Sequence, residues 1–281
     1  MHAFVSEWET APARTPPATT LLAIGDVHGC LEQLSAMCSL LGPVIAGTAR
    51  QGRSCELAMM GDYVDRGPDS LGVLRRLGGI GQDLGVPIHL LRGNHDQYLI
   101  DAMRQMPHEG ALESWAFNGG LTTLLECGVD PDAFLDPDPA EIAALLRQRL
   151  GPELMALLKA TLPWWQSGGY LFVHGGIHPE RPLETHRPED LLWMRDPFLD
   201  GDGWTHPFAV VHGHTPEGPD VLAHRVGTDS GCFFSGVLTA VELADDQLRF
   251  HLVSQDADLR RFREKLATAR HRLWRPVAAS W

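Results

Sequence analysis

The sequence lacks the long apolar run that a membrane-spanning helix needs. No stretch of the 281 residues approaches the ~18 continuous apolar residues of such a helix. The first twenty residues also lack the basic segment and apolar core of a secretory signal, and their prolines and threonines predict a flexible tail over residues 1–20. We therefore expect a cytoplasmic protein with one globular domain over residues 21–281.

The sequence contains few cysteines, and fewer basic than acidic residues. The five cysteines are odd in number and form no C-x-x-C motif, which argues against a disulfide framework or a zinc knuckle and indicates free thiols. The 23 Lys and Arg against 36 Asp and Glu give a net charge of −13, which argues against a nucleic-acid-binding surface. A phosphate-bearing substrate stays compatible with this charge, because bound cations can reverse the field inside one cleft.

One pattern recurs along the chain, in which a short apolar run leads to a glycine beside an acidic, amide or imidazole residue. The instances are Gly25-Asp26, Gly61-Asp62, Gly93-Asn94, His174-Gly175 and His212-Gly213-His214. Short apolar runs bounded by glycine predict buried strands, and helical periodicity follows the first three. This alternation predicts an α/β fold with a largely parallel sheet. Because the carboxyl ends of parallel strands share one edge, we expect these polar groups to converge on one crevice.

Two regions depart from this rhythm. Residues 107–168 contain three predicted helices, at 113–125, 139–150 and 152–162, and we interpret them as a helical cap inserted over the crevice. After Thr215 the pattern changes to strands at 221–226, 237–243 and 248–253, and the turn at Asp245-Asp246 predicts an antiparallel hairpin. A terminal helix is predicted at 258–274; its basic residues form either an anion-binding patch or a solvated face.

The polar residues of the recurring pattern suit a site for two metal ions. Such a site needs oxygen or imidazole ligands and one carboxylate that can bridge, and Asp62 offers two oxygens for that role. Mixed oxygen and imidazole ligands without thiolate favour Mn, Fe or Zn. The candidate ligands are Asp26, His28, Asp62, Asn94, His174 and one histidine of the pair His212 and His214.

These motifs resemble the signature of the phosphoprotein phosphatase family of calcineurin-like metallophosphoesterases. The matching segments are Gly25-Asp26-Val27-His28-Gly29, Gly61-Asp62-Tyr63-Val64-Asp65-Arg66-Gly67, Gly93-Asn94-His95-Asp96, His174-Gly175-Gly176 and Gly213-His214-Thr215. The resemblance covers residues 21–253 and is strongest to the bacterial branch, which includes serine/threonine phosphatases and symmetrical dinucleoside tetraphosphatases. It implies a sandwich of two mixed β-sheets flanked by helices. One departure is Asp96, where many relatives carry Glu at a position that is not a metal ligand.

The resemblance also implies a role for each site residue. Two divalent metal ions are expected, with Mn²⁺ favoured and Fe or Zn as alternatives, and His214 is favoured over His212 as a ligand. His95 is expected to act as general acid, oriented by Asp65. The implied metal ligands are Asp26, His28, Asp62, Asn94, His174 and His214, and the implied substrate-binding residues are Arg66, Asn94 and Arg195.

The expected reaction is in-line attack of a metal-bridging hydroxide on phosphorus. The leading prediction is a phosphomonoester hydrolase of the bacterial serine/threonine protein phosphatase type. Its substrate would be a phosphorylated protein, peptide or small phosphoester, with no nucleic acid or membrane as partner. Retention of Asp65 favours this reading, because some tetraphosphatases carry Ala there. The alternative is a symmetrical bis(5'-nucleosyl)-tetraphosphatase that acts on dinucleoside polyphosphates.

Weaker signals lie outside these motifs. The segment Trp115-Ala116-Phe117-Asn118-Gly119-Gly120 resembles a W-x-x-N-G-G element of bacterial relatives, and it either faces the substrate or packs in the cap. Asp229 lies in a loop that resembles one bordering the site in relatives. His178 and His206 fit solvated loop histidines better than ligands.

Overall fold

The larger of two β-sheets carries the first three sequence motifs. A computed structural model describes residues 1–104, 110–130 and 138–256 of the protein. In this sheet β3 (Thr19–Ile24), β4 (Ser54–Met59) and β5 (Ile88–Leu90) run parallel. The sheet order is β1-β12-β11-β3-β4-β5, in which β1 spans His2–Val5. Strands β11 (Val237–Ala244) and β12 (Gln247–Ser254) form the predicted antiparallel hairpin. The sheet is therefore mixed, with parallel strands on one side only.

The smaller sheet carries the last two motifs. Its order is β6-β7-β8-β10-β9, in which β7 (Tyr170–Val173), β8 (Ala209–His212) and β10 (Arg225–Gly227) are parallel. The edge strands β6 (Trp164–Ser167) and β9 (Asp220–Val221) pair antiparallel to their neighbours. The strand predicted at 221–226 is thus two short strands, β9 and β10. Strand β6 also falls inside the predicted insertion 107–168, so the helical part of that segment is shorter than expected.

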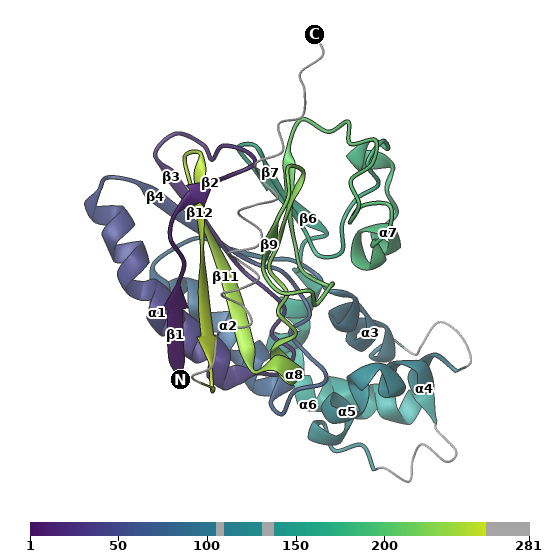
Figure 1. Ribbon diagram of the computed structural model, residues 1–281. Helices are drawn as coiled ribbons and strands as arrows, with labels where there is room; N and C mark the ends of the chain where they lie inside the picture. The colour runs from purple at the N-terminus through teal and green to yellow at the C-terminus, as the bar shows by residue number, and fades with distance from the viewer. Residues whose placement is uncertain (105–109, 131–137, 257–281) are drawn as a thin grey trace.

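Helices follow the first three strands, as the alternation predicted. Helix α1 (Leu31–Arg50) follows β3, α2 (Ser70–Leu84) follows β4, and α3 (Asn94–Ala102) begins at the third motif. The described part of the insertion contains α4 (Ala111–Trp115), the π-helical η1 (Ala116–Gly120), α5 (Leu121–Glu126) and α6 (Pro139–Lys159). Helix α6 comprises the two helices predicted at 139–150 and 152–162, which are separated at Gly151 by non-helical backbone angles, φ 71° and ψ 173°. The insertion packs beside α3, at the lower right of Figure 1.

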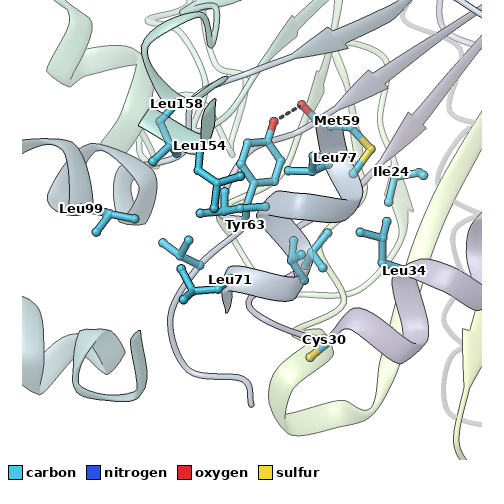
Figure 2. Close-up of a cluster of buried hydrophobic side chains, with 14 of the residues drawn as sticks. Ile24, Cys30, Leu34, Met59, Tyr63, Leu71, Leu77, Leu99, Leu154 and Leu158 are labelled. Carbon is cyan, nitrogen blue, oxygen red and sulfur yellow. Dashed lines mark hydrogen bonds between the residues drawn. The ribbon is translucent and has the colours of Figure 1, made fainter. Parts of the chain in front are cut away.

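Buried side chains form three layers that hold these elements together. The largest lies between the first sheet and helices α1, α2 and α6, and includes Leu34, Leu77 and Leu158. Within it the Tyr63 hydroxyl donates to the carbonyl oxygen of Met59, as Figure 2 shows. A second layer, with Ala23, Phe172 and Val211 among its members, lies between the two sheets. A third covers the outer face of the smaller sheet beside α7 (Pro188–Trp193). The fold is therefore the predicted sandwich of two mixed sheets flanked by helices.

The amino-terminal segment differs from the flexible tail predicted for residues 1–20. Strand β1 (His2–Val5) pairs with β12 along the sheet edge, and β2 (Glu9–Thr10) pairs with the other end of β12. Thr19 already belongs to β3. The helix predicted at 258–274 lies outside the described residues. Within the described ranges, no helix is both long and apolar enough to cross a bilayer.

Candidate active site

The predicted site residues meet where the strand-end loops of both sheets converge. Five of them adopt positive φ angles between 45° and 74°, a region that residues other than glycine rarely occupy: His28, Asp62, Asp65, Arg66 and His214. Each such residue costs on the order of 1–3 kcal/mol and persists only where the surrounding structure fixes it. Strain concentrated at these residues indicates that the loops are shaped for side-chain placement and not for stability.

Asp62 lies at the centre of the cluster. One carboxylate oxygen is 3.4 Å from Nε2 of His28, and the other is 3.4 Å from Nε2 of His174. Two groups of potential ligand atoms share this carboxylate, each with its atoms within 4.8 Å of one another: His28, Asp62 and His95, and Asp62, His174 and His214. The approach of the third-motif loop is close, because a Cβ on Gly93 would collide with Asp62. Asp62 is therefore placed as a bridging carboxylate would be.

Backbone carbonyls fix the orientation of two histidines. The Nδ1–H of His28 donates to the Val64 carbonyl at 2.8 Å, and the Nδ1–H of His174 donates to the Met60 carbonyl at 2.8 Å. Both Nε2 atoms are thereby directed toward Asp62. Carbonyls that hold the far nitrogen in this way are the usual support for a metal-binding histidine.

The remaining predicted ligands complete the cluster from the other side. The Asn94 side-chain oxygen lies 2.9 Å from His174 Nε2 and 3.0 Å from His214 Nδ1. Asp26 accepts the backbone N–H of His214 through Oδ2 at 2.9 Å. Asp26 Oδ1 and His214 Nε2 are buried and have no hydrogen-bond partner within the described part of the chain. Two unpaired ligand atoms in a buried polar cluster are the donor set that a cation would satisfy.

The pKa values of the side chains in this cluster are strongly shifted. Burial alone would lower the pKa of His174, but the carboxylates of Asp62 and Asp26 raise it to about 10. Burial lowers the pKa of His28 to about 3 and that of His214 to about 2, so both imidazoles stay neutral and able to coordinate. Burial and the neighbouring Asp229 raise the pKa of Asp26 well above its ordinary value. Asp229 is thus close enough to act electrostatically on a predicted ligand.

His95 and Asp65 form a buried pair beside this cluster. Nδ1 of His95 lies 2.7 Å from Oδ2 of Asp65, and the His95 backbone N–H donates to Asp62 at 2.9 Å. The same Asp65 oxygen accepts the indole N–H of Trp115 at 2.6 Å, while its other oxygen accepts the Thr123 hydroxyl at 2.6 Å. Both partners belong to the insertion. Trp115 therefore holds Asp65 in place and does not face the substrate.

The rest of the W-x-x-N-G-G element supports Arg66. The backbone N–H of Arg66 donates to the Gly119 carbonyl at 3.0 Å, and its Nε donates to the Asn118 carbonyl at 3.4 Å. Gly119 has a φ of 114°, and a Cβ there would collide with the Arg66 side chain, so only glycine fits. The insertion therefore braces the Asp65-Arg66 pair, a role that the motif alone did not reveal.

Asp96 connects two of the motif loops. Its carboxylate accepts the backbone N–H groups of Asp62, Tyr63 and Gly93, each at 2.9 Å. The family resemblance gives Asp96 no role as a metal ligand and does not predict this connection. Its three backbone bonds could have been anticipated only from the fold, because the second and third motifs are separated by helix α2 and strand β5.

The two arginines approach opposite ends of the cluster. Arg66 Nη1 lies 2.8 Å from His28 Nε2, whereas Arg195 Nη2 lies 3.4 Å from the His214 carbonyl. His212 is turned away, with Nδ1 donating to the Gly213 carbonyl and Nε2 accepting from Arg225. The His206 ring donates from Nε2 to the His178 carbonyl, and the His178 backbone N–H donates to Nε2 of His186, outside the cluster. The predicted ligands, His95, Asp65 and the two arginines thus lie in one cluster. His178, His206 and His212 lie outside it.

Comparison with known proteins identifies the family of this chain. The family described as calcineurin-like phosphoesterase matches residues 19–253. The chain is 39% identical to the symmetrical bis(5'-nucleosyl)-tetraphosphatase of Pectobacterium atrosepticum, over 79% of this chain and 91% of that protein. It is 26% identical to the asymmetrical bis(5'-nucleosyl)-tetraphosphatase PrpE of Oceanobacillus iheyensis, over 80% of this chain and 88% of the relative.

A solved structure whose name gives diadenosine tetraphosphatase as a candidate activity has the same fold. It superposes with a TM-score of 0.56 at 22% identity, covering 87% of this chain and all of its own. At that identity the likeness supports the fold alone. The family match, which spans most of the chain, goes further: the protein belongs to the calcineurin-like phosphoesterases and is a metal-dependent phosphoesterase.

Proposed function

We propose that the protein hydrolyses dinucleoside polyphosphates at a centre of two divalent metal ions. The observation that carries this proposal is the 39% identity to a symmetrical tetraphosphatase over 91% of that protein's length. It reverses the order of the two sequence-based alternatives, which placed the protein phosphatase first. The placement of an arginine near each end of the cluster supports it, because a polyphosphate carries negative charge along its whole length.

The proposed ligands are those that the family resemblance implies, and the two groups of potential ligand atoms that share Asp62 support a centre for two ions. Asp26, His28 and Asp62 would hold one ion, and Asp62, Asn94, His174 and His214 would hold the other. When bound, such ions would supply an activated water and neutralise the negative charge that develops on the phosphoryl oxygens. The mixed oxygen and imidazole set, free of thiolate, favours Mn²⁺ over a soft metal.

The protein's own residues would position the substrate and protonate the leaving group. Arg66, which here donates to His28, would exchange that acceptor for a phosphate oxygen, and Arg195 would bind phosphate near His214. His95 would donate a proton from Nε2 to the leaving oxygen, while Asp65 holds its Nδ1–H. Trp115 and Thr123 fix Asp65, so the insertion contributes to this proton transfer.

A substrate comparison tests the proposal. Mn²⁺-loaded protein is assayed with diadenosine tetraphosphate, a phosphoserine peptide and a phosphotyrosine peptide, and the nucleotide products are separated by ion-exchange chromatography. We expect kcat/KM for the dinucleotide to exceed that for either peptide by at least about tenfold, with two ADP as products. Preference for a phosphopeptide would overturn the proposal, and release of ATP plus AMP would reject its symmetrical form.

Phosphomonoester hydrolysis is a second candidate, favoured by the Asp65–His95 pair. A serine alkoxide is a poor leaving group that needs a proton, whereas a nucleoside diphosphate leaves more easily without one. A chain that retains the full acid pair is equipped for the harder leaving group. If this activity is physiological, kcat/KM for the phosphoserine peptide should equal or exceed that for the dinucleotide in the same assay.

A further inference from the structure

A half-exposed pair of phenylalanines borders the His28 end of the cluster. The short helix α8 (Cys232–Ser235) carries both. The Phe233 ring lies 5.5 Å from the His28 ring. The Arg66 guanidinium carbon lies over the Phe233 ring, 4.9 Å from its centroid. Phe234 packs edge-on against Phe233 at 5.0 Å. Their exposed fractions are 38% and 59%, so apolar ring surface faces solvent beside the proposed phosphate-binding arginine.

An exposed tryptophan borders the opposite end. The Trp193 ring is 43% exposed and lies 5.7 Å, edge-on, from the ring of His214. Its other ring neighbour, Tyr98, is also 5.7 Å away, and Tyr98 in turn lies beside His95. Arg195 follows Trp193 by two residues and reaches the His214 carbonyl. Each end of the cluster therefore has one arginine and one exposed aromatic surface.

This order matches the chemistry of a dinucleoside polyphosphate. Such a substrate has a planar base at each end and phosphates between, and the site presents an aromatic ring, an arginine, the metal-ligand cluster, a second arginine and a second ring. We propose that Phe233 with Phe234 forms one stacking surface for a nucleobase and that Trp193 forms the other. This inference rests on the proposed function and names the part of the substrate that the metal centre does not recognise.

Physical considerations support a ligand at these rings. Half-exposed rings beside charged groups keep apolar surface in water, which a stacked base would cover. The Phe234 ring lies over Gly231, where any Cβ would collide with it, and Gly231 and Gly236 cap α8 with φ of 64° and 71°. Gly231 thus gives the Phe234 ring a backbone surface to pack against, and more than half of Phe234 remains exposed. Stacking of a base on an aromatic side chain tolerates any base, so recognition here would not depend on base identity.

Direct binding separates this inference from the catalytic proposal. AMP and ribose 5-phosphate differ only in the base, so their dissociation constants for Mn²⁺-loaded protein are compared by isothermal titration calorimetry. We expect AMP to bind about tenfold more tightly, and the double variant Phe234→Leu/Trp193→Leu to bring the two constants within about twofold. The ratio within each variant is independent of the fraction of folded protein. Trp8→Leu is the matched control, because Trp8 is also half-exposed and lies under an arginine, Arg249, but outside the cluster.

Turnover gives the second readout. The single variants Phe234→Leu and Trp193→Leu should each raise KM for diadenosine tetraphosphate about tenfold, and kcat/KM for diadenosine tetraphosphate should fall about tenfold relative to kcat/KM for glycerol phosphate, which has no base. Equal binding of AMP and ribose 5-phosphate to the unmodified protein, or an unchanged ratio in the double variant, would overturn the inference even if the dinucleotide is hydrolysed. Absence of dinucleotide hydrolysis would instead overturn the proposed function. The ratio of the dissociation constants of ribose 5-phosphate and AMP would still decide whether the rings bind a base.

Discussion

Nδ1 of His95 lies 2.7 Å from a carboxylate oxygen of Asp65, and both side chains are buried next to Asp62. The carboxylate accepts a hydrogen bond from the Nδ1–H. Nε2 is therefore the ring nitrogen that can donate or accept a proton at the site. This arrangement is that of a general acid whose tautomer is fixed by its neighbour. The same carboxylate is held by two residues of the insertion, so the acid depends on a segment far from the motifs.

Replacement of His95 should affect poor leaving groups most. In His95→Asn the proton donor is lost, and we expect kcat to fall by about 10²–10⁴-fold on an alkyl phosphate. A nitrophenyl phosphate, whose leaving group needs little protonation, should lose less than about tenfold. Metal content is measured alongside to show that the centre survives. Equal losses on the two substrates would contradict the general-acid role.

Trp115→Phe tests the support from the insertion. The phenyl ring keeps most of the packing but removes the indole N–H that donates to Asp65. We expect kcat on an alkyl phosphate to fall about tenfold, because a misplaced catalytic group loses rate steeply. KM should change little, since Trp115 is fully buried and does not face the substrate. An unchanged kcat together with unchanged thermal stability would show that Asp65 needs no such brace.

Asp96→Asn tests the connection between the second and third motifs. The amide can accept at one oxygen only and turns its NH₂ toward backbone N–H donors, so at least one of the three bonds is lost. Burial raises the pKa of Asp96 to about 7, so at about pH 9 the carboxyl is ionised and the free energy of unfolding should fall by about 1.5–3 kcal/mol, the range for a bond to a charged group. Urea denaturation of the metal-free protein measures it. A loss below about 0.5 kcal/mol would contradict the structural role.

The buried His212 predicts a pH-dependent contribution to stability. Burial, together with the nearby Arg225, lowers its pKa to about 3, whereas the unfolded chain has an imidazole pKa of about 6.5. Only the unfolded chain therefore binds this proton as the pH falls below about 6.5, so the stabilisation is complete above that value and is lost toward pH 3. The difference in unfolding free energy between the unmodified protein and His212→Gln should shrink by up to about 1.4 kcal/mol per pH unit.

Urea titrations of both proteins at pH 7 and pH 5, each with EDTA, measure that difference without a contribution from bound metal. The other titrating groups are common to both proteins and cancel. A difference that stays constant, or grows, on going to pH 5 would show that His212 is not held neutral in the folded state.

Local sequence pattern was enough to predict that the candidate residues lie close together, although only the family resemblance favoured His214 over His212 as a ligand. Each motif lies at the end of a short buried strand, so strand periodicity and glycine position predicted the convergence of residues such as Asp26 and Asp62. The motifs also arise from two sheets, which the single parallel sheet expected from alternation did not foresee. Only the family resemblance implied the second sheet, because strand pairing depends on contacts distant in sequence.

The features that sequence pattern missed depend on long-range or backbone contacts. Trp115 bonds to a carboxylate 50 residues earlier, and no periodicity encodes such a pairing. Strand β1 has mostly exposed side chains and so lacks the alternation of a half-buried strand. It is held by backbone pairing with β12, which a hydrophobic pattern cannot show.

The central claim is that one carboxylate, Asp62, serves two metal ions, and metal stoichiometry tests it most directly. The protein is reconstituted with Mn²⁺, freed of unbound metal and analysed by inductively coupled plasma mass spectrometry beside Asp62→Asn. Asp83→Asn is the control, because that carboxylate is 60% exposed and, among the described residues, forms an ion pair only with Arg76. We predict about two ions per chain for the unmodified protein and the control. Asp62→Asn should hold at most about one ion and lose at least about 100-fold in kcat. Two ions retained in Asp62→Asn, or a single ion in the unmodified protein, would contradict the account.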